Sequence, residues 1–376
     1  MATIDEHRAT SHISIDRYER ARIVQLGRSL DNRTPIYLDT KFWILLRDAA
    51  LSGGGQAAPE YELLDLLSNL VARDRIFCPI SESIFLELMK QSDRDSRVRT
   101  AKLIDDLSLG VALIPYDRRI ATEIAHFLHS FHAKGDTLHR LNHLMFSKLS
   151  YVLGVMHPVP EQLDKATVLA IQKAFMDRMW LLPLTEMIEV IGAYPAEDLD
   201  NTRWANVINK GNARHADEIR SFEQTWDAEI RGVVEFCGDL IMDVVGSMAE
   251  SQNVSPPTKG TPEYLSARSK FQNVVYHGLK KRPEVRKQWR SLYIEACLHA
   301  AFRWDKKRRF EPNDMYDFHH ACAALGYCSA FFTEHGLKTV LSSPRLDLNK
   351  LFECRVISDV DEALAYVKGL NSLDKS

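Results

Sequence analysis

Short apolar segments alternate with stretches of helical spacing in the first third of the sequence, and this alternation most limits the possible folds. Segments 34–40 (TPIYLDT), 75–81 (RIFCPIS) and 110–116 (GVALIPY) have the composition of buried strands, and helical patterns follow each of them. The alternation returns near the end of the chain, with strands expected at 329–334 (SAFFTE) and 354–358 (CRVIS). Such alternation is typical of a parallel sheet covered by helices. We therefore expect an α/β fold.

The middle of the chain lacks this alternation. From about residue 133 to 285 the sequence shows helical patterns only. We predict a helical lead-in at 1–33, the first part of the α/β domain at 34–132, a large all-helical insertion at 133–285, and the second part of the domain at 286–376. One parallel-sheet domain is then built from both ends of the chain.

Composition indicates an ordinary globular protein. Of 376 residues, 45% are hydrophobic and 26% are charged, and the formal net charge is −3, so any nucleic-acid-binding surface has to be local. The six cysteines are scattered without a CxxC pair, which favours reduced thiols and a cytoplasmic location. No apolar run approaches the roughly 20 residues of a membrane span, so we expect no membrane partner.

Carboxylates recur near the ends of the expected strands. Asp39 ends the first strand and Glu334 the fourth, Glu87 lies in the helix after the second strand, and Asp314 and Asp317 begin the helix before the fourth. Ligands of open parallel sheets bind outside the carboxyl ends of the strands. Converging carboxylates repel one another unless a metal ion neutralises them, and their hard oxygens suit Mg²⁺ or Mn²⁺. Such a site can activate water for attack on a phosphodiester.

Each acid also has a structural interpretation. Asp39 and Asp314 could cap the helices that follow them, Glu87 could be a solvated helix residue, and Glu334 could end its strand in a turn. Their shared position relative to the strands favours a common site.

Three segments resemble the acidic segments of PIN-domain nucleases. They are IYLDTKFWILL, PISESIFLEL and YDFHHACAALGYCSAFFTE, and the resemblance covers roughly residues 34–132 and 290–370. It implies a PIN-like fold, with Asp39, Glu87 and Asp317 as catalytic residues and metal ligands and Glu334 as a further ligand. We add Asp314 to the ligand set because it lies three residues before Asp317, on the same side of the helix.

The resemblance implies metal-dependent cleavage of RNA by an endoribonuclease with one or two Mg²⁺ or Mn²⁺ ions. The chain departs from the family at Cys328-Ser329, where an Asp is frequent, and at Glu334, which follows Thr333 directly. Two alternatives remain open, a nuclease acting on DNA and a catalytically weakened module that binds RNA or a protein partner. The helices of 133–285 could also support a homodimer.

A local excess of positive charge lies between residues 280 and 309, with 11 Lys and Arg against three acids. With Trp289, Tyr293 and Trp304 interleaved, this segment could bind phosphates and stack bases. The alternative is solvated helix ends with the aromatic residues in the core. The predicted nucleic-acid-binding residues are Lys280, Lys281, Arg282, Arg286, Lys287, Arg290, Lys306, Lys307, Arg308 and Arg309.

Histidines also cluster in the sequence, between residues 126 and 143. His139 and His143 have the i,i+4 spacing of a metal-binding pair, but no Glu lies within the pair and no Cys is nearby, so the pattern does not favour zinc. His319 and His320 follow Asp317 closely. One of them could orient an acid, and a packed core position is the alternative.

Overall fold

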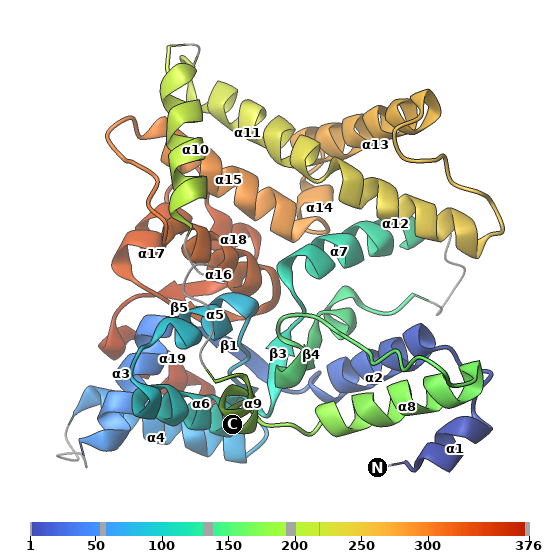
Figure 1. Ribbon diagram of the computed structural model, residues 1–376. Coiled ribbons are helices and arrows are strands. Elements are labelled where there is room, and N and C mark those ends of the chain that lie inside the picture. The colour runs from blue at the N-terminus through green and yellow to red at the C-terminus, as the bar shows by residue number, and fades with distance from the viewer. Residues whose placement is uncertain (1, 53–57, 131–137, 193–200, 218, 373–376) are drawn as a thin grey trace.

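A computed structural model describes residues 2–52, 58–130, 138–192, 201–217 and 219–372 of the chain. The fold is mainly helical and contains a small parallel sheet (Figure 1). The sheet has four strands in the order β2-β1-β5-β6. They are β1 (Thr34–Leu38), β2 (Ile76–Phe77), β5 (Ala330–Phe332) and β6 (Arg355–Ile357). The expected α/β fold is confirmed.

The two central strands come from opposite ends of the chain. β1 and β5 pair in parallel, with Leu38 opposite Phe332. From β1 the chain passes through α3 (Thr40–Leu51) and α4 (Pro59–Ala72) to β2 on one side. From β5 it passes through α17 (His335–Leu341) and α18 (Leu348–Leu351) to β6 on the other side. The chain therefore changes direction across the sheet between β1 and β5, and such a switch point is where open α/β sheets bind ligands.

The third expected strand does not belong to this parallel sheet. β3 (Val111–Leu113) pairs antiparallel with β4 (Phe146–Lys148), and a parallel bridge between Ile80 and Ala112 joins it to the segment after β2. The expectation of β3 in the main sheet is therefore wrong. The all-helical prediction for 133–285 is also wrong at 146–148, because β4 has too few residues to show the alternation that reveals a strand.

The remaining helices near the sheet occur where the sequence predicts them. They are α5 (Glu82–Lys90), α6 (Arg94–Ser108), α7 (Tyr116–Ser130), α16 (Asp314–Tyr327) and α19 (Val360–Ser372). Helix α16 packs against β1, β5 and α5, while α4 packs against α3, β2 and α19. In α5 the apolar residues Ile84, Phe85, Leu88 and Met89 are buried along one face. This packing places Glu87 at the border of the core.

The described part of 133–285 divides into two groups of helices. In the first, α8 packs on α1 and α2, and α9 packs on α6; in the second, α11 packs on α13 and α15, and α12 packs on α13 and α7. Residues 133–137, 193–200 and 218 of this region lie outside the described residues. The bounds are α1 (Ile4–Ala9), α2 (Ile15–Ser29), η2 (Leu141–Leu144), η3 (Leu149–Tyr151), α8 (Lys165–Met179), α9 (Leu184–Ile191), α10 (Thr202–Arg214), α11 (Phe222–Phe236), α12 (Gly238–Ser251), α13 (Pro262–Lys281), α14 (Pro283–Arg286) and α15 (Arg290–Trp304).

Two features of the composition can be compared with the structure. All six cysteines are buried and free. Within the described ranges, no helix combines the length and the apolar character needed to cross a bilayer.

Candidate active site at the carboxyl ends of β1 and β5

Asp39 lies at the carboxyl end of β1, beside the carboxyl end of β5. Its backbone N–H donates to the carbonyl of Phe332 at 2.9 Å, which extends the pairing of the two strands. Its buried carboxylate accepts a hydrogen bond from the backbone N–H of Phe42 at 3.1 Å and so caps α3. The interpretation of Asp39 as a helix cap is therefore confirmed. Because the cap engages Oδ1, a role as a metal ligand through Oδ2 is compatible with it.

Glu87 of α5 contacts side chains from two other helices, α3 and α16. From α3, the Thr40 hydroxyl donates to Oε2 of Glu87, and from α16, Nε2 of His320 lies 2.9 Å from the same oxygen. Burial would raise the pKa of Glu87, but the charge of His320 and the hydrogen bonds of His320 and Thr40 lower it below its usual value. Glu87 is therefore held as a carboxylate, and its interpretation as a solvated helix residue is wrong.

Asp317 lies one turn before His320 on α16. The pKa of its carboxyl is raised to about 7, chiefly by burial; the charges of Glu334, Glu87 and Asp314 contribute to the rise, and His320 opposes it. Asp314 itself has other partners. It accepts hydrogen bonds from Arg308 at 3.0 Å and from the backbone N–H of Glu311 at 2.6 Å, so it anchors the start of α16.

Glu334 lies at the same edge of the sheet as Asp39. It is exposed at the N-cap position of α17 and its side chain makes no capping hydrogen bond. Its charge raises the pKa of Asp317, and the neighbouring buried Thr333 lowers the pKa of Asp39. The four acids at Asp39, Glu87, Asp317 and Glu334 are therefore electrostatically coupled, as expected for residues near a common edge.

His320 is fixed in the middle of these acids by both ring nitrogens. Nε2 contacts Glu87, and Nδ1 lies 2.8 Å from the hydroxyl of Tyr37, a fully buried residue of β1. The Tyr37 hydroxyl is in turn 2.6 Å from the hydroxyl of Ser81. Burial would lower the pKa of His320, but Glu87, Asp39 and Asp317 raise it above its usual value. The interpretation of His320 as a residue that orients an acid is favoured by this geometry.

We expect the folded chain to gain stability as the pH falls from about 7 to about 4 in metal-free buffer. The pKa of Asp39 in the folded protein is about 6, above its ordinary value of 3.8, chiefly because the side chain is buried. A carboxyl whose pKa rises on folding stabilises the protein below its unfolded pKa, and this stability is lost as the pH rises through the folded pKa. The effect is about 3 kcal/mol, at about 1.4 kcal/mol per pKa unit.

Urea unfolding across this pH range tests the expectation in wild-type protein and in Asp39→Asn. Asn caps helices as well as Asp does, so the variant should keep α3 and lose only the titrating group. Its free energy of unfolding should depend less steeply on pH. The same pH dependence in both proteins would contradict the raised pKa.

A second buried charge pair supports α5 and was missed by sequence analysis. Arg119 of α7 is fully buried and donates to Glu82 at 3.0 and 3.1 Å and to the carbonyl of Ile114 at 2.7 Å. Glu82 also accepts a hydrogen bond from the backbone N–H of Tyr116 at 3.0 Å. The available signal was the position of Arg119 and Glu123, which are spaced i,i+4 on the buried face of α7.

The donor chemistry of the acids fits Mg²⁺ or Mn²⁺, because these hard ions prefer carboxylate oxygens. In the part of the chain that the structure describes, however, no three His, Cys, Asp or Glu side chains are already placed to hold one metal ion. Asp39 is engaged by its cap and Glu87 by Thr40 and His320. Metal binding would therefore draw Asp39, Glu87 and Asp317 toward a shared ion, and the relief of their mutual repulsion would favour this movement.

Half of the predicted nucleic-acid-binding residues have partners inside the protein. Lys280 pairs with Asp227, Lys287 with Glu353 and Arg308 with Asp314, while Arg286 and Arg290 donate to backbone carbonyls. The other five are exposed and form no ion pair within the described ranges; they are Lys281, Arg282, Lys306, Lys307 and Arg309.

The aromatic residues of this segment differ in exposure. Trp289 and Tyr293 are buried, as the core alternative predicts, and they cannot stack on bases. Trp304 is half-buried and lines a pocket.

The histidines of the 126–143 region do not converge where they are described. Nε2 of His126 lies 2.9 Å from the carbonyl of His139, and Nε2 of His143 lies 2.8 Å from Asp31. His129 is also described, whereas His132 lies outside the described residues. His319 stacks on Tyr116, with ring centroids 4.6 Å apart.

Comparisons of this chain with protein-family models, with curated proteins and with solved structures found no match. The fold and the site define the chain as an α/β protein with coupled acids around a buried histidine at the switch point of its sheet.

Proposed function

We propose that the chain is a metal-dependent nuclease that hydrolyses phosphodiester bonds of RNA. One observation carries the proposal. The carboxylates of Asp39, Glu87 and Asp317 come from three separate elements, and all three raise the pKa of one histidine, His320. This group lies at the edge of the sheet where ligands of this fold class bind. The resemblance of the surrounding segments to PIN-domain nucleases supports an endoribonuclease with a PIN-like fold, whose second part follows the helical region 133–285.

The residues at this edge have separable roles in the proposed reaction. Asp39, Glu87 and Asp317 would hold Mg²⁺ or Mn²⁺, which supplies a Lewis acid and lowers the pKa of bound water. Before a metal ion binds, the cap of α3 orients Asp39, and the contacts with Thr40 and His320 orient Glu87, so binding would require both carboxylates to turn toward the ion. Glu334, exposed at the same edge, would be a further ligand of the metal ion, as the resemblance implies.

Incubation of purified protein with labelled single-stranded RNA and DNA, in Mg²⁺, Mn²⁺ or EDTA, tests the proposal. We expect RNA cleavage that EDTA abolishes. Faster cleavage of DNA would keep the nuclease and change its substrate. Intact RNA and DNA after incubation with saturating Mn²⁺ would overturn the nuclease function.

A catalytically weakened module that binds RNA or a protein partner is the second candidate. It is favoured by the lack, among the described residues, of side chains already placed to hold a metal ion, and by the departures at Ser329 and Glu334. This candidate predicts RNA binding in EDTA without cleavage in Mn²⁺. The nuclease predicts RNA binding in EDTA and also RNA cleavage in Mn²⁺.

Replacing His320 with Gln should weaken Mn²⁺ binding by about 10- to 100-fold, the usual effect of losing a residue that orients a metal ligand. Gln cannot contact both Glu87 and Tyr37 as the imidazole does. Mn²⁺ titration followed by electron paramagnetic resonance measures the change, with the melting temperature recorded beside it. His319→Gln is the matched control, because its imidazole stacks on Tyr116 instead. Equal Mn²⁺ affinities in wild-type and His320→Gln protein would remove His320 from the site.

We also place the protein in the cytoplasm, on the basis of its free and buried cysteines.

A second copy or another protein would dock on the helices of 133–285, where Phe236 is 81% exposed. Light scattering after size-exclusion chromatography would detect the homodimer.

A further inference from the structure

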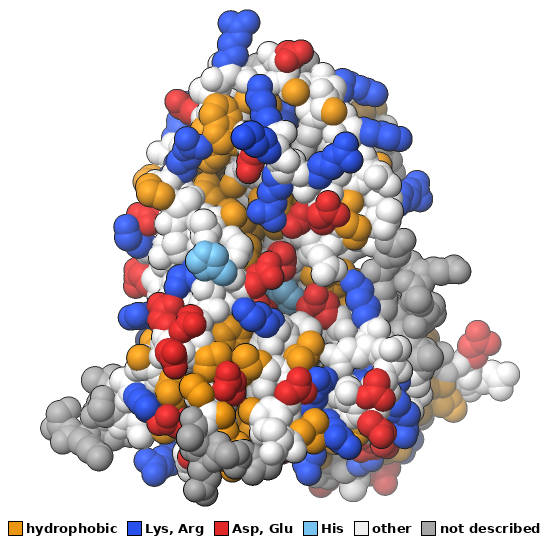
Figure 2. All heavy atoms as spheres, turned by 90° about the vertical axis from the view of Figure 1, so that its left-hand side faces the viewer, with side chains coloured by type: hydrophobic (Ala, Val, Ile, Leu, Met, Phe, Trp, Pro, Cys, Tyr) orange, Lys and Arg blue, Asp and Glu red, His pale blue; other side chains and the backbone are white. Residues whose placement is uncertain are grey.

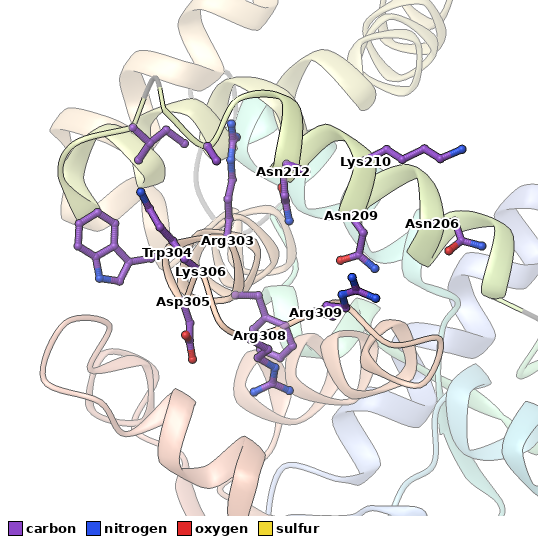
Figure 3. Close-up of a pocket in the computed structure, with 14 residues that line it drawn as sticks. Asn206, Asn209, Lys210, Asn212, Arg303, Trp304, Asp305, Lys306, Arg308 and Arg309 are labelled. Atoms are coloured by element: carbon purple, nitrogen blue, oxygen red, sulfur yellow. The ribbon is translucent and has the colours of Figure 1, made fainter.

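A pocket of about 440 Å³ lies between α10 and the segment 303–309 (Figure 3). Its volume falls within the range of ligand-binding sites. We propose that this pocket binds one nucleotide unit of a single-stranded nucleic acid, through its phosphate and its base. The proposal takes from the proposed function only that the ligand is a nucleic acid.

The pocket carries positive charge that the protein does not neutralise. Figure 3 shows Arg303, Lys306 and Arg309 on the side of the segment toward α10, whereas Asp305 points away from that helix. Arg303 pairs with Glu229 at 2.5 Å. Lys306 and Arg309 are exposed and have no ion-pair partner among the described residues. Two cations are therefore free to contact phosphate oxygens.

Hydrogen bonds connect the two walls of the pocket, α10 and the chain next to the basic segment 303–309. The side chain of Asn209 on α10 donates to the carbonyl of Phe310 at 2.8 Å and accepts from its backbone N–H at 2.9 Å. These two hydrogen bonds hold the basic segment against the helix. The pocket is therefore formed before a ligand arrives, which lowers the entropic cost of binding.

The remaining lining suits a base better than a simple anion. Asn206 and Asn212 bring side-chain amides from α10, and an amide can both donate to and accept from the edge of a base. Trp304 lines the pocket with a half-buried ring that also contacts Phe222 and the guanidinium of Arg345, and aromatic rings stack on bases. Cations, amides and an aromatic ring in one pocket are the chemistry that recognises a nucleotide.

The pocket is connected to the candidate active site through Arg308. This residue belongs to the pocket lining and donates to Asp314 at 3.0 Å, one turn of α16 before Asp317. Figure 2 shows Lys and Arg side chains gathering on the upper part of one face of the molecule, with acidic side chains near its middle. A strand held in the pocket could therefore continue to the acids at the end of the sheet.

Fluorescence anisotropy in EDTA measures binding without cleavage. The probes are a labelled single-stranded RNA of about 12 nucleotides and a DNA of the same sequence. In Lys306→Ala/Arg309→Ala, we expect the Kd to rise on the order of ten-fold at about 0.1 M salt, and the salt slope to fall by about 1.4 for two lost phosphate contacts. Asn212→Asp places a negative charge on the opposite wall and should also weaken binding.

The matched control is Arg99→Ala/Lys102→Ala, which removes the same charge from two exposed residues of α6 that lie outside the pocket lining and outside the predicted nucleic-acid-binding residues. It should change the Kd less than about two-fold, and melting temperatures should match the wild type in all variants. Adenosine monophosphate should compete with the probe. An equal rise in Kd for the pocket variant and the control variant would overturn the pocket site. If polyglutamate displaced the probe as effectively as unlabelled RNA does, the pocket would be assigned to an acidic protein partner.

Failure of this proposal is distinguishable from failure of the proposed function. Cleavage that is unaffected in Lys306→Ala/Arg309→Ala, with unchanged binding, removes the pocket and keeps the nuclease. Pocket-dependent binding without cleavage in Mn²⁺ keeps the pocket and removes the nuclease. RNA and DNA that bind equally would show that phosphate and base, and not the ribose hydroxyl, are recognised.

Discussion

Asp39→Asn should abolish metal-dependent cleavage, with a loss on the order of 10²-fold or more, and Asp317→Asn should do the same. Removing a residue that only orients a metal ligand costs up to about 100-fold, so losing a ligand should cost at least as much. Stability should not fall, because Asn still caps α3 and because an amide at position 317 removes the negative charge whose burial, together with the neighbouring acids, raises the pKa of Asp317 to about 7. Single-turnover cleavage of labelled RNA in Mn²⁺, with melting temperatures, measures both effects.

The control for this pair is Glu235→Gln, the same exchange of carboxylate for amide at an exposed residue of α11. It should cleave as the wild type does. Wild-type activity in Asp39→Asn or Asp317→Asn would mean that the coupled acids are structural and that cleavage, if present, occurs elsewhere.

Arg119→Met should lower the free energy of unfolding by about 3–5 kcal/mol, because it leaves the buried carboxylate of Glu82 without its cation. Arg119 is fully buried, and its guanidinium is the side-chain partner of Glu82 at the start of α5. Since α5 also carries Glu87, the damage should reach the candidate site. Urea unfolding measures the loss.

The double variant Arg119→Met/Glu82→Gln should recover part of this stability. Removing both charges of a buried pair costs less than removing one, and the Gln carbonyl can still accept from the backbone N–H of Tyr116. A double variant that is less stable than Arg119→Met would show that the pair stabilises through packing or hydrogen bonding and not through charge compensation.

The order of the central elements could be predicted from sequence because their apolar runs are unambiguous. Residues 36–38 and 330–332 are fully buried, as expected of strands covered on both faces. The partners of β3 could not be predicted in the same way. β4 has three residues, and its pairing with β3 joins residues 111–113 to 146–148. Such a short strand leaves no periodic signal, and pairing is decided by tertiary packing.

The acids of the candidate site could be placed from sequence by one rule, that parallel strands expose their carboxyl ends at a common edge. Spacing alone could not separate Asp314 from Asp317, because both lie on the same side of α16. The two residues differ because Arg308 donates a hydrogen bond to the carboxylate of Asp314. The buried contacts of Tyr37 with His320 and of Glu82 with Arg119 join segments far apart in the chain, so a local pattern can indicate that Arg119 is buried but not which residue it pairs with.

A Mn²⁺ titration followed by electron paramagnetic resonance tests the central claim most directly, because free and protein-bound Mn²⁺ give different signals. The account predicts that wild-type protein removes one or two Mn²⁺ ions per chain from the free signal, as a carboxylate metal centre does. It also predicts that Asp39→Asn and Asp317→Asn both lose this binding while Glu235→Gln keeps it. Equal Mn²⁺ binding by all four proteins, or no binding by any of them, would contradict a metal centre at the carboxyl ends of β1 and β5.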